Sequence, residues 1–417
     1  MKKRVVFHVD VNSAYLSWEA AYRLQHGAKV DLRDVPAIVG GDPEKRRGIV
    51  LAKSLPAKRA GIKTGEVLFK AFQKCPTLTA VRPDYRLYMK SSQALVDLLK
   101  EYSPEVQRFS IDECFVEFTD VSQLWGDPVD VAKAIGARIK KELGFTVNIG
   151  VSSNKLLAKV ASEFEKPDKV HTLFPEEMES KMWPLPIGEL FGVGRRTEPK
   201  LKNIGIMTIG DLAKADPEII RYKLGKFGTL IWNYANGIED SMISEPGVES
   251  VKGIGNSSTL PKDIYTKESA YLYLLSLTEM VAMRLRDTGN LCGLVSISIR
   301  SHELDRAGRQ RRLFYNTDST KQIFEEVKSL FDELWDERPV RHLGVRVSKL
   351  VPNEYRQLPL MEAEQTEKQE RLDQTIDKLR IRFGNKTIVR GSFLHTGVKP
   401  VMGGVGEEDY PMMSFEL

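Results

Sequence analysis

The chain has 417 residues, of which 41% are hydrophobic and 29% are charged, a composition that is typical of a globular protein with several domains and excludes a disordered chain. Its three cysteines and six histidines form no zinc or disulfide spacing, and no apolar run approaches the roughly 20 residues that cross a membrane, so we expect a cytoplasmic protein with no membrane partner. The formal net charge of +5 fits a polyanionic partner without identifying one.

Apolar periodicity predicts alternating strands and helices over the first 170 residues. Strands are expected at 4–11, 36–40, 48–52 and 145–151, with a hairpin at 106–118. Helices are expected at 13–26, 84–102 and 127–143, with short helices within 54–75 and a helix in "SSNKLLAKVASEFEKP". This order favours an antiparallel sheet with helices on one face, an α+β arrangement.

The second half of the chain changes character. Short helices broken by glycines are expected from about 184 to 235, and "ANGIEDSMISEPG" is typical of a linker. The apolar pattern of residues 250–350 predicts a separate unit of helices and alternating strands. A polar loop then precedes a charged helix at 364–383, a short strand at 386–394 and a tail rich in glycine and proline.

Two adjacent acids interrupt the apolar hairpin "RFSIDECFVEF", and a third acid, Asp10, ends the first strand. Burying a carboxylate without a partner is costly, and a divalent cation is the usual relief. Asp10, Asp112 and Glu113 would together hold two Mg²⁺ ions that activate an attacking oxygen and stabilise a leaving pyrophosphate. In the alternative interpretation, Asp10 caps a helix and one of the paired acids reaches water or Arg108.

A shared site makes a geometric demand on the paired acids. On a regular strand, Asp112 and Glu113 would point to opposite faces of the sheet. We therefore expect a turn at 110–112 and a regular strand that begins near Cys114, so that both carboxylates swing toward Asp10.

Several segments resemble the Y-family translesion DNA polymerases. They are, in chain order, "HVDVNSAYLSWE", "FSIDECFVEF", "GVSSNKLLAKVASEFEKPD", "LFGVGRRTEPKLKNIGIMTIGDLA" and "VKGIGNSSTLPKDI". The resemblance covers about residues 4–350, and the tail after 353 resembles the UmuC-type branch rather than the shorter DNA polymerase IV form.

The resemblance implies a multidomain α+β fold shaped as a right hand, with a ferredoxin-like palm, small fingers, a helix-hairpin-helix thumb and an α/β little finger. The implied parts are a palm at 1–20 and 76–170, fingers at 21–75, a thumb at 171–240, a little finger at 241–352 and a tail at 353–417.

The resemblance also implies roles for residues around the acids. Asp10, Asp112, Glu113 and the Val11 carbonyl would bind the metal ions. The backbone amides of Ser13, Ala14 and Tyr15 would face the triphosphate of the nucleotide. The Tyr15 ring would act as a steric gate against a ribose 2′-hydroxyl, and Lys159 would contact the β- and γ-phosphates. From the residues alone, Tyr15 is also compatible with a core aromatic and Lys159 with an exposed helix lysine.

The fingers depart from the family pattern. The family shows a hydroxyl residue, a tyrosine and an arginine at spacings of three, where this chain has Ala52, Leu55 and Lys58. Two hydroxyls are lost, and a point charge replaces a bidentate guanidinium. We expect weaker nucleotide binding with intact chemistry, or else a different grip on the triphosphate.

Other segments predict contacts with DNA. Gly192 and Gly194 would bring backbone amides to a phosphate, followed by Arg195, although the same pattern suits a tight turn. Strands that alternate apolar residues with Arg300 and Arg346 suit phosphate contact or a solvated face. We expect the cluster Arg306, Arg309, Arg311 and Arg312 to be a solvated hairpin tip.

A short apolar peptide follows the little finger. "RQLPLM" places Gln357, Leu358, Leu360 and Met361 in a polar loop, and it resembles the peptide by which bacterial polymerases bind the sliding clamp.

We therefore expect a monomeric, template-directed DNA polymerase that acts on primer-template DNA and deoxynucleoside triphosphates and takes part in lesion bypass. The alternatives are a nucleotidyl cyclase, and a polymerase-like protein that binds primer ends or the clamp without synthesis.

Overall fold

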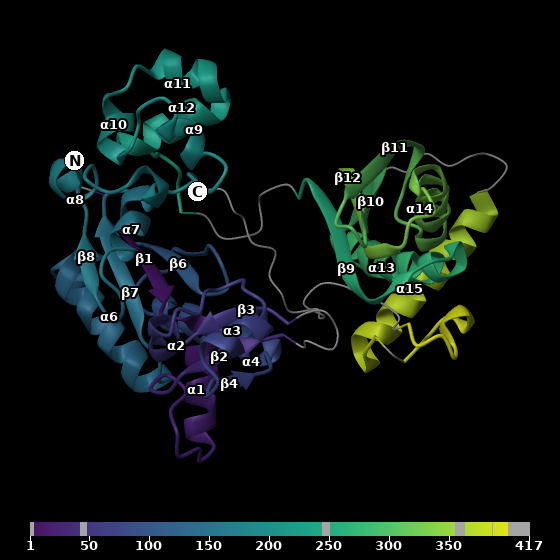
Figure 1. Ribbon diagram of the computed structural model, residues 1–417, viewed down its shortest axis with the longest axis horizontal. Helices are drawn as coiled ribbons and strands as arrows, with labels where there is room; N and C mark the ends of the chain where they lie inside the picture. The colour runs from purple at the N-terminus through teal and green to yellow at the C-terminus, as the bar shows by residue number, and fades with distance from the viewer. Residues whose placement is uncertain (1–3, 42–47, 244–250, 355–362, 386, 399–417) are drawn as a thin grey trace. The chain divides into compact units, whose positions relative to one another are not determined.

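The computed structural model describes residues 4–41, 48–243, 251–354, 363–385 and 387–398 (Figure 1). Contacts divide the chain into two compact units, with the boundary near residue 248. Each unit is described by itself. None of the helices in these ranges is long and apolar enough to cross a membrane.

A five-stranded sheet with the order β5-β6-β1-β7-β8 forms the centre of the first unit. Its strands are β1 (Val6–Val11), β5 (Val106–Arg108), β6 (Glu113–Glu117), β7 (Val147–Ser152) and β8 (Val170–Thr172). The central strand β1 pairs antiparallel with β6 and β7, but β8 pairs parallel with β7. The sheet is therefore mixed, and the expectation of a purely antiparallel sheet was wrong at this edge.

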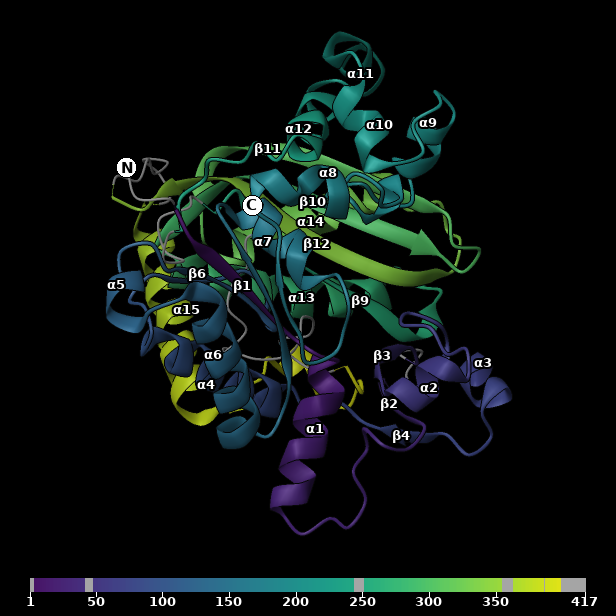
Figure 2. The same ribbon diagram turned by 90° about the vertical axis from the view of Figure 1, so that its left-hand side faces the viewer.

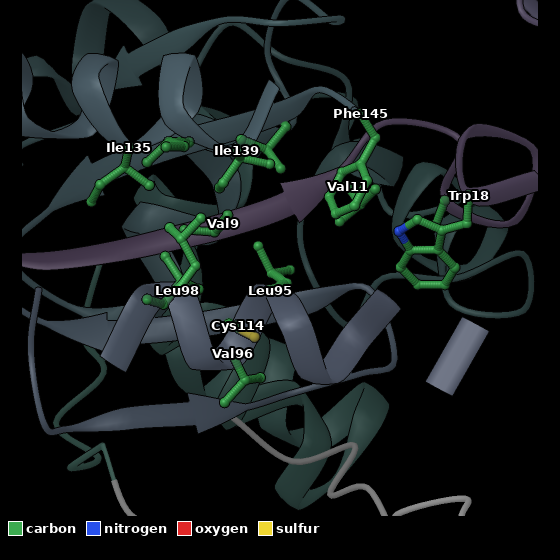
Figure 3. Close-up of a cluster of buried hydrophobic side chains, with 14 of the residues drawn as sticks. Val9, Val11, Trp18, Leu95, Val96, Leu98, Cys114, Ile135, Ile139 and Phe145 are labelled. Carbon is green, nitrogen blue, oxygen red and sulfur yellow. The ribbon is translucent and has the colours of Figure 1, made fainter. Parts of the chain in front are cut away.

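Helices cover both faces of this sheet, so the expectation of helices on one face was also wrong. On one face, α4 (Tyr85–Lys100) and α6 (Pro128–Leu143) pack on β1, and Figure 3 shows Val9 beside Leu98 of α4 and Ile139 of α6. On the other face lies α7 (Lys155–Ser162). A Cβ added to Gly150 of β7 would lie 1.9 Å from the Ala158 carbonyl oxygen, so α7 needs glycine there to approach. Helices are needed on both faces because all six residues of β1 are buried, so side chains on either side of the strand are covered.

Helix α1 (Ala14–Gln25) continues directly from the end of β1, and a small sheet contacts it (Figure 2). This sheet has the order β3-β2-β4. It consists of β2 (Ala37–Gly40), β3 (Val50–Lys53) and β4 (Thr79–Val81), with α2 (Leu55–Arg59) and α3 (Leu68–Lys74) against it. The short helices of the expected thumb segment include α9 (Glu198–Lys202), α10 (Ile209–Lys214), α11 (Pro217–Leu224) and α12 (Lys226–Ala235).

The second unit contains a four-stranded antiparallel sheet with the order β11-β10-β12-β9. The strands are β9 (Gly253–Ile264), β10 (Asn290–Ser301), β11 (Arg306–Thr317) and β12 (Val340–Pro352). Helices α13 (Lys267–Asp287) and α14 (Thr320–Leu334) pack on one face, where Val295, Ile297 and Val345 are buried. The alternating pattern of the sequence correctly predicted which residues face this core.

The charged helix α15 (Ala363–Phe383) is held to the second unit by buried ion pairs. Arg286 Nε lies 2.6 Å from Asp377 Oδ2, and Arg380 donates to Glu279 Oε1 at 3.1 Å. The strand expected at 386–394 was wrong, because the described residues form only a 3-10 turn at Gly391–Phe393. The Ile388 carbonyl accepts hydrogen bonds from the Arg380 guanidinium rather than from a partner strand.

Candidate active site

The chain bends between β5 and β6, immediately before the paired acids. The amides of Phe109 and Ser110 both donate to the Glu113 carbonyl, at 2.9 and 3.2 Å, and the Val11 amide donates to the Asp112 carbonyl at 3.0 Å. Regular pairing starts at Glu113, which lies directly opposite Asp10. The bend at 110–112 is therefore present as expected, and the strand begins one residue earlier than predicted.

This arrangement brings three carboxylates together, but they are not the three that the sequence suggested. Oxygen atoms of Asp10, Glu113 and Glu163 all lie within 4.8 Å of one another, a grouping that suits a metal ion. Asp112 is outside this group, and its Oδ1 accepts a hydrogen bond from the Ser110 hydroxyl at 2.6 Å. Glu163 was missed, although it follows Lys159 by one helical turn and so shares its face.

Two lysines neutralise part of this acidic charge. Lys159 Nζ lies 2.5 Å from Glu113 Oε1. Lys166, which the sequence analysis did not select, donates to Asp10 Oδ2 and lies 2.9 Å from Glu163 Oε2. Two ammonium groups therefore face three carboxylates, so the local balance stays negative even before Asp112 is counted.

Burial dominates the electrostatics of the site. It raises the pKa of Asp10 to about 7, against the lowering effect of Lys166, and the charges of Glu113 and Asp112 add to the rise. Burial also raises the pKa of Asp112, with a further rise from Glu113. A proton and a cation therefore compete for the same carboxylates.

A buried histidine lies beneath the acids. His8 is fully buried, and its Nδ1 is 2.7 Å from the Ser162 hydroxyl. Its Nε2 has no hydrogen-bond partner among the described residues and lies 4.0 Å from Glu113 Oε1. Burial, followed by the charges of Lys159 and Lys166, lowers the pKa of His8 well below its usual value, so the ring is neutral at physiological pH.

The start of α1 adjoins the acids. Ser13 precedes the helix in a left-handed conformation with φ 50°, and Ala14 is its first residue. Tyr15 is half-buried, and its ring stacks on Tyr88 with centroids 4.5 Å apart. The aromatic contacts fit the core interpretation, while the partial exposure of the residue is compatible with the gate interpretation.

In the fingers segment, the three substituted positions differ in environment. Ala52 is buried in β3, Leu55 is 44% exposed at the start of α2, and Lys58 lies in the last turn of α2. Lys53 donates to the Thr64 hydroxyl at 2.8 Å, and burial with the Lys58 charge lowers its pKa. The Glu66 charge acts in the opposite direction and raises the pKa of Lys53.

The predicted phosphate-binding turn lies immediately before α9. Gly192 has φ 88°, a conformation that favours glycine, and a Cβ added to Gly194 would meet nothing within 4 Å. Both glycines and Arg195 are exposed. The turn is thus accessible to a ligand, although no contact identifies one.

The face of the second sheet opposite its helices carries arginines. Arg300 lies beside Arg306 across the strands, Arg346 is exposed, and strand alternation places Arg312 on the same side. Arg309 and Arg311 instead pair with Glu333 and Glu326 of α14. The arginine cluster of β11 is therefore divided between two faces and is not a single solvated tip. Residues 357–361 of the predicted clamp peptide lie outside the described residues.

Three family models match the chain. Residues 9–163 match the impB/mucB/samB family, residues 251–360 match the C-terminal domain of that family, and residues 175–206 match its helix-hairpin-helix motif. Together these matches cover more than half of the chain, in the same order as the segments that suggested the resemblance.

Curated relatives match over nearly the whole length. The chain is 43% identical to a DNA polymerase IV of Clostridium acetobutylicum, with 94% of this chain and 98% of the relative covered. It is 38% identical to DNA polymerase IV 2 of Bacillus subtilis, with 94% and 95% covered. Among solved structures, a Y-family DNA polymerase chimera (Dbh-Dpo4(243-245)-Dbh) matches with a TM-score of 0.72 and 22% identity, over 84% of this chain and 100% of the other.

The raised pKa of Asp10 predicts how stability of the metal-free protein depends on pH. The folded value of about 7 exceeds the ordinary value of 3.8, so the folded state binds the proton more tightly, and stability falls as pH rises between about 4 and 7. Asp10→Asn removes this loss and should raise the Tm at pH 8 by several degrees, on the order of 5 °C, and less at pH 5.

Thermal unfolding in the presence of a chelator measures this difference. His8 acts in the opposite direction, because its lowered pKa makes the folded state less stable as the pH falls below 6.5, the ordinary pKa of histidine. This effect is present in both the wild type and Asp10→Asn, so it cancels in the difference between their Tm values. An equal gain in Tm at both pH values would contradict the assigned titration of Asp10.

Proposed function

The chain belongs to the impB/mucB/samB family and is a Y-family DNA polymerase of translesion synthesis, and we propose that the acids around Asp10 form its catalytic centre. In this proposal, the 3′-hydroxyl of a primer attacks the α-phosphate of a deoxynucleotide, and pyrophosphate leaves. The observation that carries the proposal is the convergence of Asp10 and Glu113 from two paired strands.

The donor atoms fit a divalent metal ion. Carboxylate oxygens are the ligands that Mg²⁺ prefers, and oxygens of Asp10, Glu113 and Glu163 lie within 4.8 Å of one another. The resemblance adds the Val11 carbonyl and Asp112, whose Oδ1 accepts a hydrogen bond from Ser110 and whose second carboxylate oxygen could bind a metal ion. When bound, two Mg²⁺ ions would favour deprotonation of the attacking hydroxyl and neutralise the triphosphate.

The two lysines give the site a way to exchange partners. In the described structure, Lys159 forms an ion pair with the Glu113 carboxylate, and Lys166 donates a hydrogen bond to the Asp10 carboxylate. If those carboxylates held a cation, both ammonium groups would lose their present partners, and the triphosphate would supply the anion that they then need. We propose that Lys159, as the resemblance implies, and Lys166 both move to the phosphates of the nucleotide.

The remaining nucleotide contacts are proposed at the end of β1 and in the fingers. The amides of Ser13, Ala14 and Tyr15 begin α1, a position that favours negative charge. Lys58 would supply a further positive charge from α2. The ring of Tyr15, which is half-buried, would exclude a ribose 2′-hydroxyl.

DNA contacts are proposed for two surfaces. The turn with Gly192, Gly194 and Arg195 would bind a phosphate through its amides, and the open sheet face with Arg300 and Arg346 would bind phosphates without reading sequence. The division into palm, fingers, thumb, little finger and tail is part of the same proposal.

Partners and branch are proposed from the sequence alone. We propose a monomer in the cytoplasm that binds the sliding clamp through Gln357–Met361. Deletion of residues 357–361 should then abolish the stimulation of DNA synthesis by the clamp. The UmuC-type branch is not confirmed. The relatives named DNA polymerase IV cover 93–98% of this chain, so the length of the tail does not separate the two branches.

Loss of one central acid should abolish synthesis. Glu113→Ala removes an oxygen ligand opposite Asp10 and should reduce primer extension with Mg²⁺ at least about a hundredfold. The matched control Glu325→Ala removes an exposed glutamate of α14 that forms an ion pair with Lys328. Extension by Glu113→Ala at the wild-type rate would contradict the proposed centre, whereas a wild-type protein that binds primer ends without extending them would favour the non-catalytic alternative.

The substituted fingers should make nucleotide binding weaker and dependent on one lysine. Because Lys58 replaces the fork of an arginine, its removal should raise the KM for the incoming nucleotide about three- to tenfold, with a smaller effect on kcat. Steady-state primer extension measures both constants, with Lys70→Ala on the neighbouring helix α3 as the control. If the wild type has a nucleotide KM typical of the family and Lys58→Ala leaves it unchanged, then other residues bind the triphosphate and the proposed role of Lys58 is wrong.

A further inference from the structure

Tyr15 rests against a second aromatic ring from another helix. Its ring is nearly parallel to that of Tyr88 of α4, with an interplanar angle of 10° and centroids 4.5 Å apart. Tyr85, one turn earlier on α4, meets the Tyr15 ring edge-on at 6.1 Å. The side of Tyr15 that faces α4 is thus backed by a stacked ring, which is a favourable aromatic geometry.

Tyr88 is fixed at its far end by a buried carboxylate. The ring is fully buried, and its hydroxyl donates to Glu19 Oε1 at 2.9 Å. Glu19 is itself only 5% exposed, and its other oxygen lies 3.5 Å from Nε of the partly exposed Arg23. Burial and the Glu19 charge raise the pKa of Tyr88, so the phenol remains a donor over the physiological pH range.

These contacts restrict how far the Tyr88 ring can move. Sliding or tilting the ring would break a hydrogen bond to a charged acceptor and leave Oε1 of the buried Glu19 carboxylate without this donor. Trp18 restrains the ring from a third direction, with centroids 5.8 Å apart. Glu19 and Tyr15 lie one turn apart on α1, so the carboxylate that anchors Tyr88 belongs to the same rigid helix as the ring that Tyr88 supports.

We propose that Tyr88 and Glu19 are positioning residues that hold the Tyr15 ring in place and thereby set the discrimination between deoxyribonucleotides and ribonucleotides. This inference rests on the proposed polymerase function and on the proposed role of Tyr15 at the sugar. Neither Tyr88 nor Glu19 touches the nucleotide in this scheme. They act by preventing the Tyr15 ring from receding.

The physical reason is that steric exclusion depends on the stiffness of the excluding group. A ring that yields by about 1 Å accepts an added hydroxyl at little cost, whereas a ring in a close-packed stack moves only if its support moves too. Removing the anchor of the support should therefore admit ribonucleotides without removing any group that binds the triphosphate.

The test is the ratio of kcat/KM for a deoxynucleotide to that for the matching ribonucleotide. Tyr88→Phe keeps the stacked ring but loses the hydroxyl, and we expect this ratio to fall about five- to tenfold, chiefly because ribonucleotide insertion rises. Glu19→Ala should have the same effect, and the double variant should lose no more than the larger single effect, because both changes break one hydrogen bond. Glu19→Gln keeps an acceptor oxygen and should restore most of the ratio.

Tyr271→Phe is the matched control. It breaks a tyrosine–aspartate hydrogen bond of 2.6 Å, from Tyr271 to Asp332, in the second unit, and should leave the ratio unchanged. Thermal unfolding of each variant separates a general loss of stability from the loss of discrimination, since a merely structural role for Tyr88 would lower the Tm while leaving the ratio at its wild-type value.

Tyr15→Ala separates this inference from its premise. If Tyr15→Ala abolishes discrimination while Tyr88→Phe and Glu19→Ala keep the wild-type ratio, the positioning role is wrong and the gate stands. If Tyr15→Ala keeps the wild-type ratio, the gate and the inference both fail, although DNA synthesis by the wild type still supports the polymerase. Additive effects of Tyr88→Phe and Glu19→Ala would also overturn the inference.

Discussion

The structure around the site depends on the cost of holding carboxylates together away from water. Asp10 is 8% exposed, and burial is the largest cause that raises its pKa to about 7, with a further rise from the charges of Glu113 and Asp112. Lys159 and Lys166 offset part of this cost by direct contact with Glu113 and Asp10. Gathering buried acids does not stabilise the fold, because replacing a cluster of buried charged residues with neutral residues often increases the free energy of unfolding. The arrangement is therefore best explained by a cation that the acids bind during function.

The surrounding fold serves to bring those acids to one place. Strand β1 lies in the centre of its sheet and is buried along its whole length, so Asp10 at its end has a fixed position. The bend before β6 starts regular pairing at Glu113 and sets that residue opposite Asp10. Helix α7 lies close on Gly150 and carries Lys159 to the same edge. The second unit is built separately, with its own core and an open face that bears arginines.

Much of this was predictable from the sequence, because local patterns report local structure. The apolar alternation of β10 and β12 predicted their buried faces, and two adjacent acids in an apolar hairpin predicted the bend. The sequence did not predict that Glu163 and Lys166 lie beside Asp10, since only the packing of α7 and the loop after it brings them there. The parallel edge strand β8 and the Arg380 contact that replaces a strand at Ile388 likewise arise from tertiary contacts.

We propose that Asp10 and Glu113 bind divalent metal ions in the presence of a nucleotide. The most direct measurement is the number of Mn²⁺ ions bound per chain, determined by electron paramagnetic resonance with a non-hydrolysable deoxynucleoside triphosphate present and the metal bound by nucleotide alone subtracted. We expect that the wild type binds metal, that affinity rises as pH increases through about 7, and that Asp10→Asn and Glu113→Gln each weaken binding strongly. Equal Mn²⁺ binding by the wild type and both variants would show that these two acids are not metal ligands.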